Sequence, residues 1–239
     1  MRYLIVLLLS FSIASLTAQN RYQLSGGVDS PLLYSGAAGI GISIPINKKI
    51  KSLSLDQISA LDPLQVNPLD RIAIHTYSQS ARNASDIFLY STPVYPLSLL
   101  ADHGSRNEFG NISTMYLETA LVNYGITNLV KVLTKRTRPY AYNTGLDNEL
   151  KLTKNTRRSF FSGHTSHVAA STFFTAKVLT DMNPEGSNNT MYWITAATIP
   201  AITGYLRVKG GKHFPTDVLI GYAVGAIVGI LVPELHKIP

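Results

Sequence analysis

The chain has no cysteine among its 239 residues, and this absence excludes several kinds of chemistry. A disulfide framework, a thiolate metal site and a cysteine nucleophile are all ruled out. Charged residues are also few, at 15%, whereas hydrophobic residues reach 45%. No long series of segments alternates apolar and polar residues as strands do. The length suffices for one domain with a substantial core, and we expect that core to be helical.

The charged residues that are present are mostly basic. Lysine and arginine together number 21 and aspartate and glutamate 14, which gives a formal net charge of +7. This balance is compatible with nucleic acid, anionic lipid or a phosphorylated substrate as partner. The carboxylates form no cluster of metal-ligand spacing, so the sequence gives no reason to expect a metal.

The first twenty residues, MRYLIVLLLSFSIASLTAQN, have the pattern of an export signal. Arg2 provides a positive start, residues 4–13 are apolar, and Thr17 and Ala18 are small or polar residues at the exit. This pattern predicts a signal peptide over residues 1–18, cleaved near Ala18. The alternative is a retained membrane anchor. In both cases we expect an exported protein of the periplasm or cell envelope.

The remaining chain divides into two parts. Residues 19–83 are mixed, with a short helix after Ser54 and a Gly-rich apolar stretch at 30–46 that is either a short helix or a packed loop. Residues 84–239 contain five apolar segments of helical length, at 84–102, 112–136, 163–182, 190–206 and 216–233. We therefore expect an all-α bundle of about five to six helices over 84–239, preceded by a small irregular N-terminal region.

A first polar motif, KVLTKRTRP, stands at the end of the second segment. Lys131 and Arg138 are seven residues apart, which places them on one face if the helix continues to Pro139. The pair would then present two cations to a ligand. The plainer interpretation is a solvated basic helix end, because cations near a helix C-terminus are favourable in any case.

A second motif, SGHTSH, opens the third segment. Ser162 is a good N-cap, Gly163 allows a ligand to approach the backbone, and His164 falls in the first turn. The free N–H groups of a helix N-terminus favour an anion. His167 lies one turn further on and is expected to pack. Taken alone, the motif fits equally a capped helix beside a partly buried histidine.

A third motif, RVKGGKHFPTD, precedes the last segment. Arg207 and His213 are six residues apart, and Asp217 follows His213 by four. A carboxylate in that position can orient the imidazole and increase its basicity. The plainer interpretation is a histidine in a glycine-rich loop beside an aspartate that complements the helix dipole.

Together the three motifs favour a phosphate site. In an up-down bundle their loops face the same end, where imidazoles, cations and a helix N-terminus can hold a phosphate and attack it without a metal. The order K-x6-RP, SGH, then R-x5-H-x3-D resembles the type 2 phosphatidic acid phosphatase (PAP2) and vanadium haloperoxidase superfamily, over about residues 84–233.

The resemblance implies a role for each residue. Phosphate oxygens would be bound by Lys131, Arg138, Ser162, Gly163 and Arg207. His213 would attack phosphorus to give a phosphohistidine, and Asp217 would hold His213. His164 would protonate the leaving alkoxide and then assist the attacking water. No metal and no cofactor is implied.

Two positions depart from the family pattern. Phe161 stands where the family commonly has proline, and Leu206 where it often has serine. Neither change removes a catalytic group, although the second takes one hydroxyl from the anion site.

The implied activity is a phosphatase acting on lipid A, undecaprenyl pyrophosphate or a phosphatidyl phosphate, and nucleic acid is not an expected partner. Alternatives are a soluble periplasmic acid phosphatase, a vanadium haloperoxidase, or a non-catalytic envelope protein.

The sequence leaves the relation to the membrane open. Segment 216–233 is the best spanning candidate, and its Gly221, Gly225 and Gly229 permit close helix packing. The segment at 163–182 is polar for lipid because His167 and Lys177 lie inside it. If the five later segments span after signal cleavage, the catalytic loops fall outside; if 30–46 spans as well, they fall inside. We expect a periplasmic active site on a membrane-associated or partly embedded protein.

Overall fold

Long helices dominate the computed structural model, which describes residues 20–239 and contains no β-strand among them. The helices of twenty residues or more are α1 (Gly26–Lys49), α6 (Phe109–Thr134), α8 (Gly163–Met182), α9 (Asn189–Lys209) and α10 (Pro215–His236). The short α-helices are α2 (Leu55–Ser59), α3 (Gln79–Tyr90), α4 (Val94–Leu97), α5 (His103–Asn107) and α7 (Asn148–Lys151). Single turns of 3₁₀-helix are η1 (Pro63–Gln65), η2 (Arg71–His75), η3 (Ser98–Ala101), η4 (Pro139–Tyr142) and η5 (Lys154–Arg157). The predicted all-α bundle is confirmed, with more helices than expected. The predicted signal peptide lies outside the described residues.

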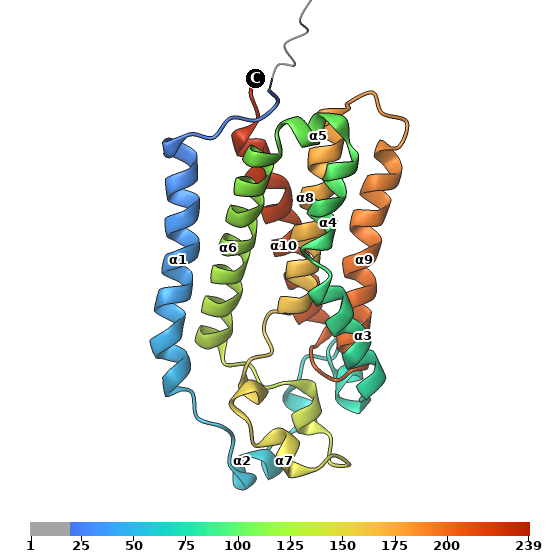
Figure 1. Cartoon of the computed structure of the whole chain (residues 1–239). Coiled ribbons are helices and arrows are strands. Elements are labelled where there is room, and N and C mark those ends of the chain that lie inside the picture. The colour runs from blue at the N-terminus through green and yellow to red at the C-terminus, as the bar shows by residue number, and fades with distance from the viewer. Residues whose placement is uncertain (1–19) are drawn as a thin grey trace, which may run out of the picture.

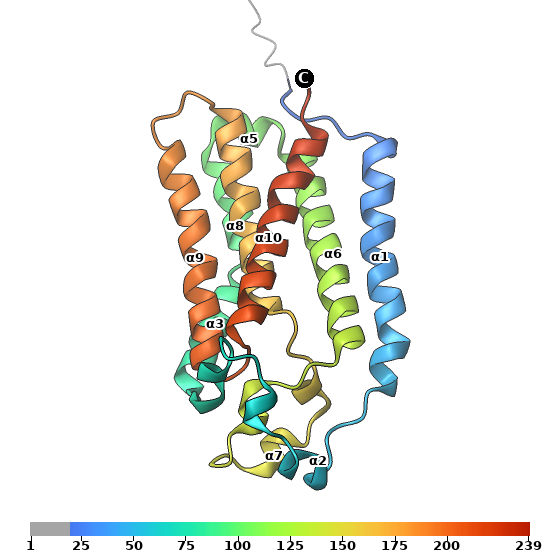
Figure 2. The same ribbon diagram turned by 180° about the vertical axis from the view of Figure 1, so that it is seen from behind.

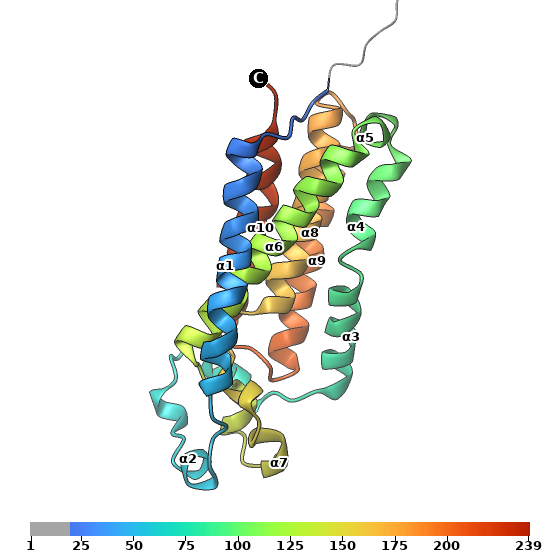
Figure 3. The same ribbon diagram turned by 60° about the vertical axis from the view of Figure 1, so that its left-hand side comes forward.

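Most predicted segments correspond to single helices, but the first does not. The segment predicted at 84–102 is divided into α3, α4 and η3. Proline explains the interruption, because Pro93 and Pro96 lack the N–H that a continuous helix requires. Figure 3 shows α3 and α4 as a column beside α9, interrupted between the two helices.

Helix α1 lies in the region expected to be irregular. The stretch at 30–46 is part of this 24-residue helix, which packs along α6 (Figure 1). The two backbones approach closely at glycines: a Cβ added to Gly125 would lie 2.5 Å from the carbonyl oxygen of Gly36. The apolar stretch is therefore part of a long helix, and it is neither the short helix nor the packed loop that was expected.

Helices α8 and α10 form another close contact (Figure 2). A Cβ added to Gly221, Gly225 or Gly229 would lie 2.5, 2.1 or 2.4 Å from a backbone oxygen of the 162–170 segment. The close packing predicted from the spacing of these glycines is confirmed.

The described start of the chain and its C-terminus meet at one end of the bundle, and the polar loops lie at the other. Tyr22 pairs with Lys237, and Gln23 donates a backbone hydrogen bond to His236. Figure 1 shows the loops between α6 and α8, together with α2 and α7, at the opposite end. The described start of the chain and the predicted catalytic loops therefore lie at opposite ends of the bundle.

One helix among the described residues, α10, is long and apolar enough to cross a membrane, with a mean hydropathy of 2.1. A buried core helix of a soluble protein satisfies the same criterion, so this finding alone is weak evidence for a spanning segment.

Candidate active site

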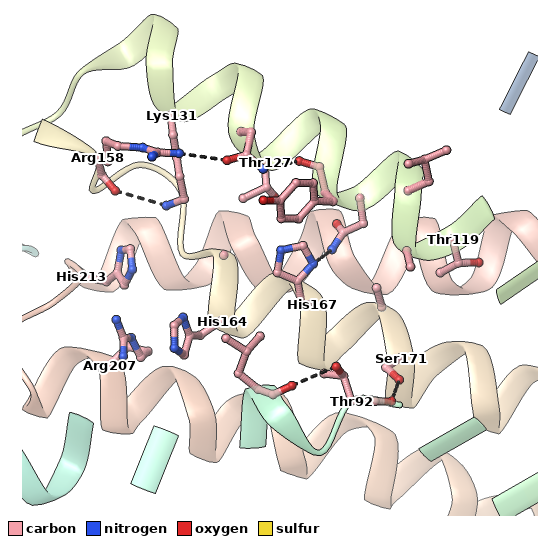
Figure 4. Close-up of a pocket in the computed structure, with 18 of the residues that line it drawn as sticks. Thr92, Thr119, Thr127, Lys131, Arg158, His164, His167, Ser171, Arg207 and His213 are labelled. Atoms are coloured by element: carbon pink, nitrogen blue, oxygen red, sulfur yellow. Dashed lines mark hydrogen bonds between the residues drawn. The ribbon is translucent and has the colours of Figure 1, made fainter. Parts of the chain in front are cut away.

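The three motifs converge on one cavity of about 670 Å³ at the loop end of the bundle. Figure 4 shows Lys131, His164, Arg207 and His213 gathered at one end of it. Six of the eight predicted site residues line the cavity: Lys131, Arg138, Gly163, His164, Arg207 and His213. The other two, Ser162 and Asp217, are fully buried behind this lining.

Lys131 and Arg138 meet at the cavity, but not because they share a helix face. Helix α6 ends at Thr134, Lys135 adopts a left-handed conformation at φ 47°, and Arg138 is extended. The expected helical face is therefore wrong, since the chain turns back on itself before Pro139. Lys131 Nζ donates to the carbonyls of Phe161 and Arg158, which fixes the ammonium beside the start of α8.

His213 presents one nitrogen to the cavity and the other to the protein. Its Nε2 lies 3.2 Å from Arg138 Nη1, on the side where an anion would sit. Its Nδ1 lies 3.6 Å from Asp217 Oδ2, which is longer than a hydrogen bond. Burial, and next the positive charge of Arg138, lowers the pKa of His213 well below its usual value. The imidazole is therefore neutral, as a nucleophile requires.

Asp217 organises the loop that carries His213. Its Oδ2 accepts hydrogen bonds from Ser159 Oγ at 2.5 Å and from the backbone N–H of Phe214 at 2.9 Å. Its Oδ1 lies 2.5 Å from Arg136 Nη1. The carboxylate thus joins the loop before α8 to the first turn of α10, and it lies close behind the imidazole.

The start of α8 supplies backbone rather than hydroxyl groups to the cavity. Ser162 Oγ accepts from the N–H of Thr165 and is the predicted N-cap. Its hydroxyl is engaged with Thr165 Oγ1 at 2.9 Å. Gly163 lies against α6, where an added Cβ would be 3.2 Å from Thr127 Cγ2. The glycine leaves the helix N-terminus open to an anion.

His164 and Arg207 share a partner that the sequence analysis missed. Asp86, on α3, lies 2.7 Å from His164 Nε2 and 3.3 Å from Arg207 Nη1. A lone carboxylate in the apolar run ASDIFLY was the available signal for this residue. Arg158 also lines the cavity and was missed, although it lies in the basic stretch just before SGH.

Positive charge at the site exceeds the negative charge that faces it. Lys131, Arg138 and Arg207 are 8%, 5% and 4% exposed, and of these only Arg207 has a carboxylate within 4 Å among the described residues. Burial lowers the pKa of Arg138 to about 10. Burial, and next the charge of Arg138, lowers the pKa of Lys212 to about 7. Such buried and unbalanced cations favour a bound anion.

The other end of the cavity is less polar. Leu89 of α3 and a row of α6 residues line it, and Figure 4 shows Thr92, Thr119 and Ser171 at that end. The apolar and aromatic α6 residues are Tyr116, Leu117, Ala120, Leu121 and Tyr124, between which the polar Thr119 and Asn123 also line the cavity. The cavity therefore joins a cationic end to an apolar passage between helices.

Comparison with known proteins places the chain in a class. Residues 113–237, more than half of the sequence, match the model of the PAP2 superfamily. The chain belongs to this superfamily, as its three motifs predict.

The chain is similar to two individual phosphatases. A stretch of 77 residues, 32% of this chain, is 34% identical to a lipid A 4'-phosphatase of Porphyromonas gingivalis and spans only 29% of that protein. A solved transmembrane PAP2 type phosphatidylglycerolphosphate phosphatase from Bacillus subtilis is 20% identical, with a TM-score of 0.49. That comparison covers 84% of this chain and 96% of the other.

Proposed function

We propose that this protein is a phosphatase that removes phosphate from a phosphorylated lipid through a phosphohistidine intermediate. The observation that carries the proposal is the excess of buried positive charge around His213, whose Nε2 points at that charge. A phosphate dianion supplies the missing negative charge, and the same cations stabilise the additional charge of the transition state. The proposed chemistry needs no metal in the cavity.

The proposed reaction uses the two cavity histidines in turn. His213 Nε2 attacks phosphorus, and the bond from phosphorus to the ester oxygen breaks. The leaving alkoxide takes a proton from His164, which Asp86 holds at 2.7 Å. A water molecule then gives a proton back to His164 and attacks phosphorus, so the P–N bond breaks and phosphate leaves. Asp217 positions His213 at the developing charge, and catalytic hydrogen bonds commonly shorten on substrate binding.

The apolar passage supports a lipid rather than a small soluble substrate. A phosphomonoester of a polar alcohol leaves this passage unfilled, whereas an acyl or prenyl chain can occupy it. The activity of the Porphyromonas gingivalis relative makes lipid A one candidate among lipid phosphates.

The outer faces of the bundle support a place in the bilayer. Large apolar side chains are exposed on several long helices, among them Tyr34, Ile42, Leu117, Leu133, Met191, Ile194, Leu219 and Ile227. Many exposed large apolar side chains on the same bundle are typical of contact with lipid or a partner. We propose that the bundle spans the membrane, with the catalytic end on the periplasmic side.

The first experiment measures phosphate release by the detergent-purified full chain in EDTA. The substrates are lipid A, undecaprenyl pyrophosphate, phosphatidic acid and p-nitrophenyl phosphate, and the matched variant is His213→Gln. We expect release from a lipid substrate that vanadate inhibits and His213→Gln abolishes. Wild-type rates in His213→Gln would refute the mechanism. Preference for p-nitrophenyl phosphate would favour a soluble acid phosphatase, and bromide oxidation with vanadate a haloperoxidase.

The second experiment tests orientation. The described start of the chain and the C-terminus lie together at the end opposite the catalytic loops. If the bundle spans the membrane, both chain ends are therefore on one side and the catalytic loops on the other. A signal peptide cleaved near Ala18 and a periplasmic active site are therefore incompatible predictions for a spanning bundle. A green fluorescent protein fused after Pro239 should fluoresce, since our proposal places that end in the cytoplasm. Activity of a secreted alkaline phosphatase at the same position would reverse the orientation.

A further inference from the structure

A second group of polar side chains meets at the end of the bundle away from the catalytic cavity. Asp29 is in the first turn of α1, Glu118 lies within α6, and His236 ends α10. Asp29 Oδ1 lies 2.8 Å and Glu118 Oε2 lies 3.2 Å from His236 Nε2. Figure 1 shows the start of α1 and the end of α10 at the end opposite α2 and α7.

This group carries negative charge without a matching cation. The side chains of Glu118 and His236 are fully buried, and that of Asp29 is 19% exposed. No donor among the described residues makes a hydrogen bond to either carboxylate oxygen of Glu118. Within that part of the chain, no lysine or arginine forms an ion pair with Asp29 or Glu118. A fully buried carboxylate with no hydrogen-bond donor, next to a second carboxylate, is strongly unfavourable unless a positive charge joins them.

The imidazole is oriented as a metal ligand would be. His236 Nδ1 lies 2.8 Å from the carbonyl oxygen of Val232. A carbonyl only accepts, so Nδ1 carries a hydrogen and Nε2 faces the two carboxylates. Metal-bound histidines usually donate their other N–H in this way. Ligand atoms at about 2.1 Å from a common ion lie about 3.0–3.4 Å apart, close to the spacings observed here.

We propose that Asp29, Glu118 and His236 bind a divalent transition-metal ion, with Zn²⁺ and Mn²⁺ as the fitting candidates. One imidazole with two carboxylates suits these ions better than an all-oxygen site would. The role is structural, because the ion joins the first turn of α1 to α6 and α10. Helix α1 packs mainly on α6, so a tie to α10 fixes its otherwise peripheral start. The ion takes no part in chemistry at the far end of the bundle.

The test measures metal content and stability, and it does not depend on turnover. Full-length protein is loaded with Zn²⁺ or Mn²⁺, dialysed, and analysed by inductively coupled plasma mass spectrometry. We expect one ion per chain in the wild type and none in Glu118→Gln. EDTA should lower the Tm of the wild type by about 5–10 °C and leave that of Glu118→Gln unchanged.

A matched control and a second variant complete the design. Glu234→Gln alters a carboxylate of the same end that pairs with Lys177, and it should retain the ion. If Glu118→Gln does not fold, Asp29→Asn serves, because Asp29 is partly exposed; its affinity should fall roughly 10-fold or more. Absence of both bound ion and EDTA effect in the wild type would overturn the proposal, leaving a protonated His236 as the compensating charge. Phosphate release at temperatures well below the Tm should persist in EDTA. The metal proposal and the phosphatase proposal can therefore be refuted independently of each other.

Discussion

His164 Nε2 lies 2.7 Å from Asp86 Oδ1, and the same carboxylate oxygen lies 3.3 Å from Arg207 Nη1. Asp86 belongs to α3, outside the three motifs, and it is the one carboxylate within 4 Å of the buried arginine or the histidine among the described residues. In the proposed mechanism it orients the general acid.

Asp86→Asn should therefore lower kcat by roughly 10-fold on alkyl phosphate esters, a part of what a positioned acid contributes. The loss should be much smaller on p-nitrophenyl phosphate, because nitrophenolate leaves without a proton. Steady-state kinetics on the two substrates make the comparison, with the exposed Asp56→Asn as control. An equal loss on both substrates would show that Asp86 acts only on structure.

The low pKa of His213 has consequences at acid pH. Burial is its main cause, followed by the charge of Arg138. The nucleophile stays neutral below the ordinary histidine pKa of about 6.5, so the acid limb of the rate should lie below that pH. The unfolded chain binds a proton there that the folded chain does not. The free energy of unfolding should therefore fall as pH decreases below about 6.5, by up to about 1.4 kcal/mol per pH unit from this residue.

Denaturant unfolding across this pH range measures the effect of His213. His213→Gln should reduce the acid dependence, whereas His75→Gln, at an exposed position, should leave it unchanged. Equal acid dependence in wild type and His213→Gln would contradict a buried neutral imidazole.

Glycine-to-alanine substitution should have opposite effects at two positions, Gly225 in the contact between α8 and α10 and Gly41 on an open face of α1. A Cβ at Gly225 would lie 2.1 Å from the carbonyl oxygen of Ser166, so Gly225→Ala should destabilise the protein by about 1–3 kcal/mol. A Cβ at Gly41 of α1 meets nothing within 4 Å, so Gly41→Ala should stabilise by about 0.5–1 kcal/mol through helix propensity. Thermal unfolding checks both signs, and a neutral Gly225→Ala would contradict the close packing.

The sequence predicted the bundle and most of the cavity lining because both depend on local patterns. Helix-length apolar runs defined α8 to within a residue, and three short motifs supplied six lining residues. What it missed depends on tertiary contact. Asp86 reaches His164 only because α3 packs beside α8 and α9, and Glu118 meets Asp29 only because α1 lies along α6.

The sequence pattern also did not predict that the helix ends at Thr134, before Lys135. Heptad spacing places Lys131 and Arg138 on one face only if the helix continues, and a left-handed residue ends it first. Both cations nevertheless line the cavity, because Arg138 donates to the carbonyls of Asn155 and Lys212, which hold its guanidinium in place. The sequence thus predicted that Lys131 and Arg138 line one site, although the shared helix face from which this was inferred does not exist.

Arg136 joins two buried carboxylates, those of Asp70 and Asp217. Its Nη1 lies 2.5 Å from Asp217 and its Nη2 2.7 Å from Asp70, whose side chains are 0% and 1% exposed. Arg136→Ala leaves both buried carboxylates without a counter-charge, although their hydrogen bonds from Ser159, Phe214 and Thr216 remain, and should cost about 3 kcal/mol. Arg136→Lys should cost less than Arg136→Ala but still destabilise the protein, since a single ammonium cannot pair with both carboxylates. Urea unfolding measures the cost, and a loss no greater than that of the exposed Lys154→Ala would contradict it.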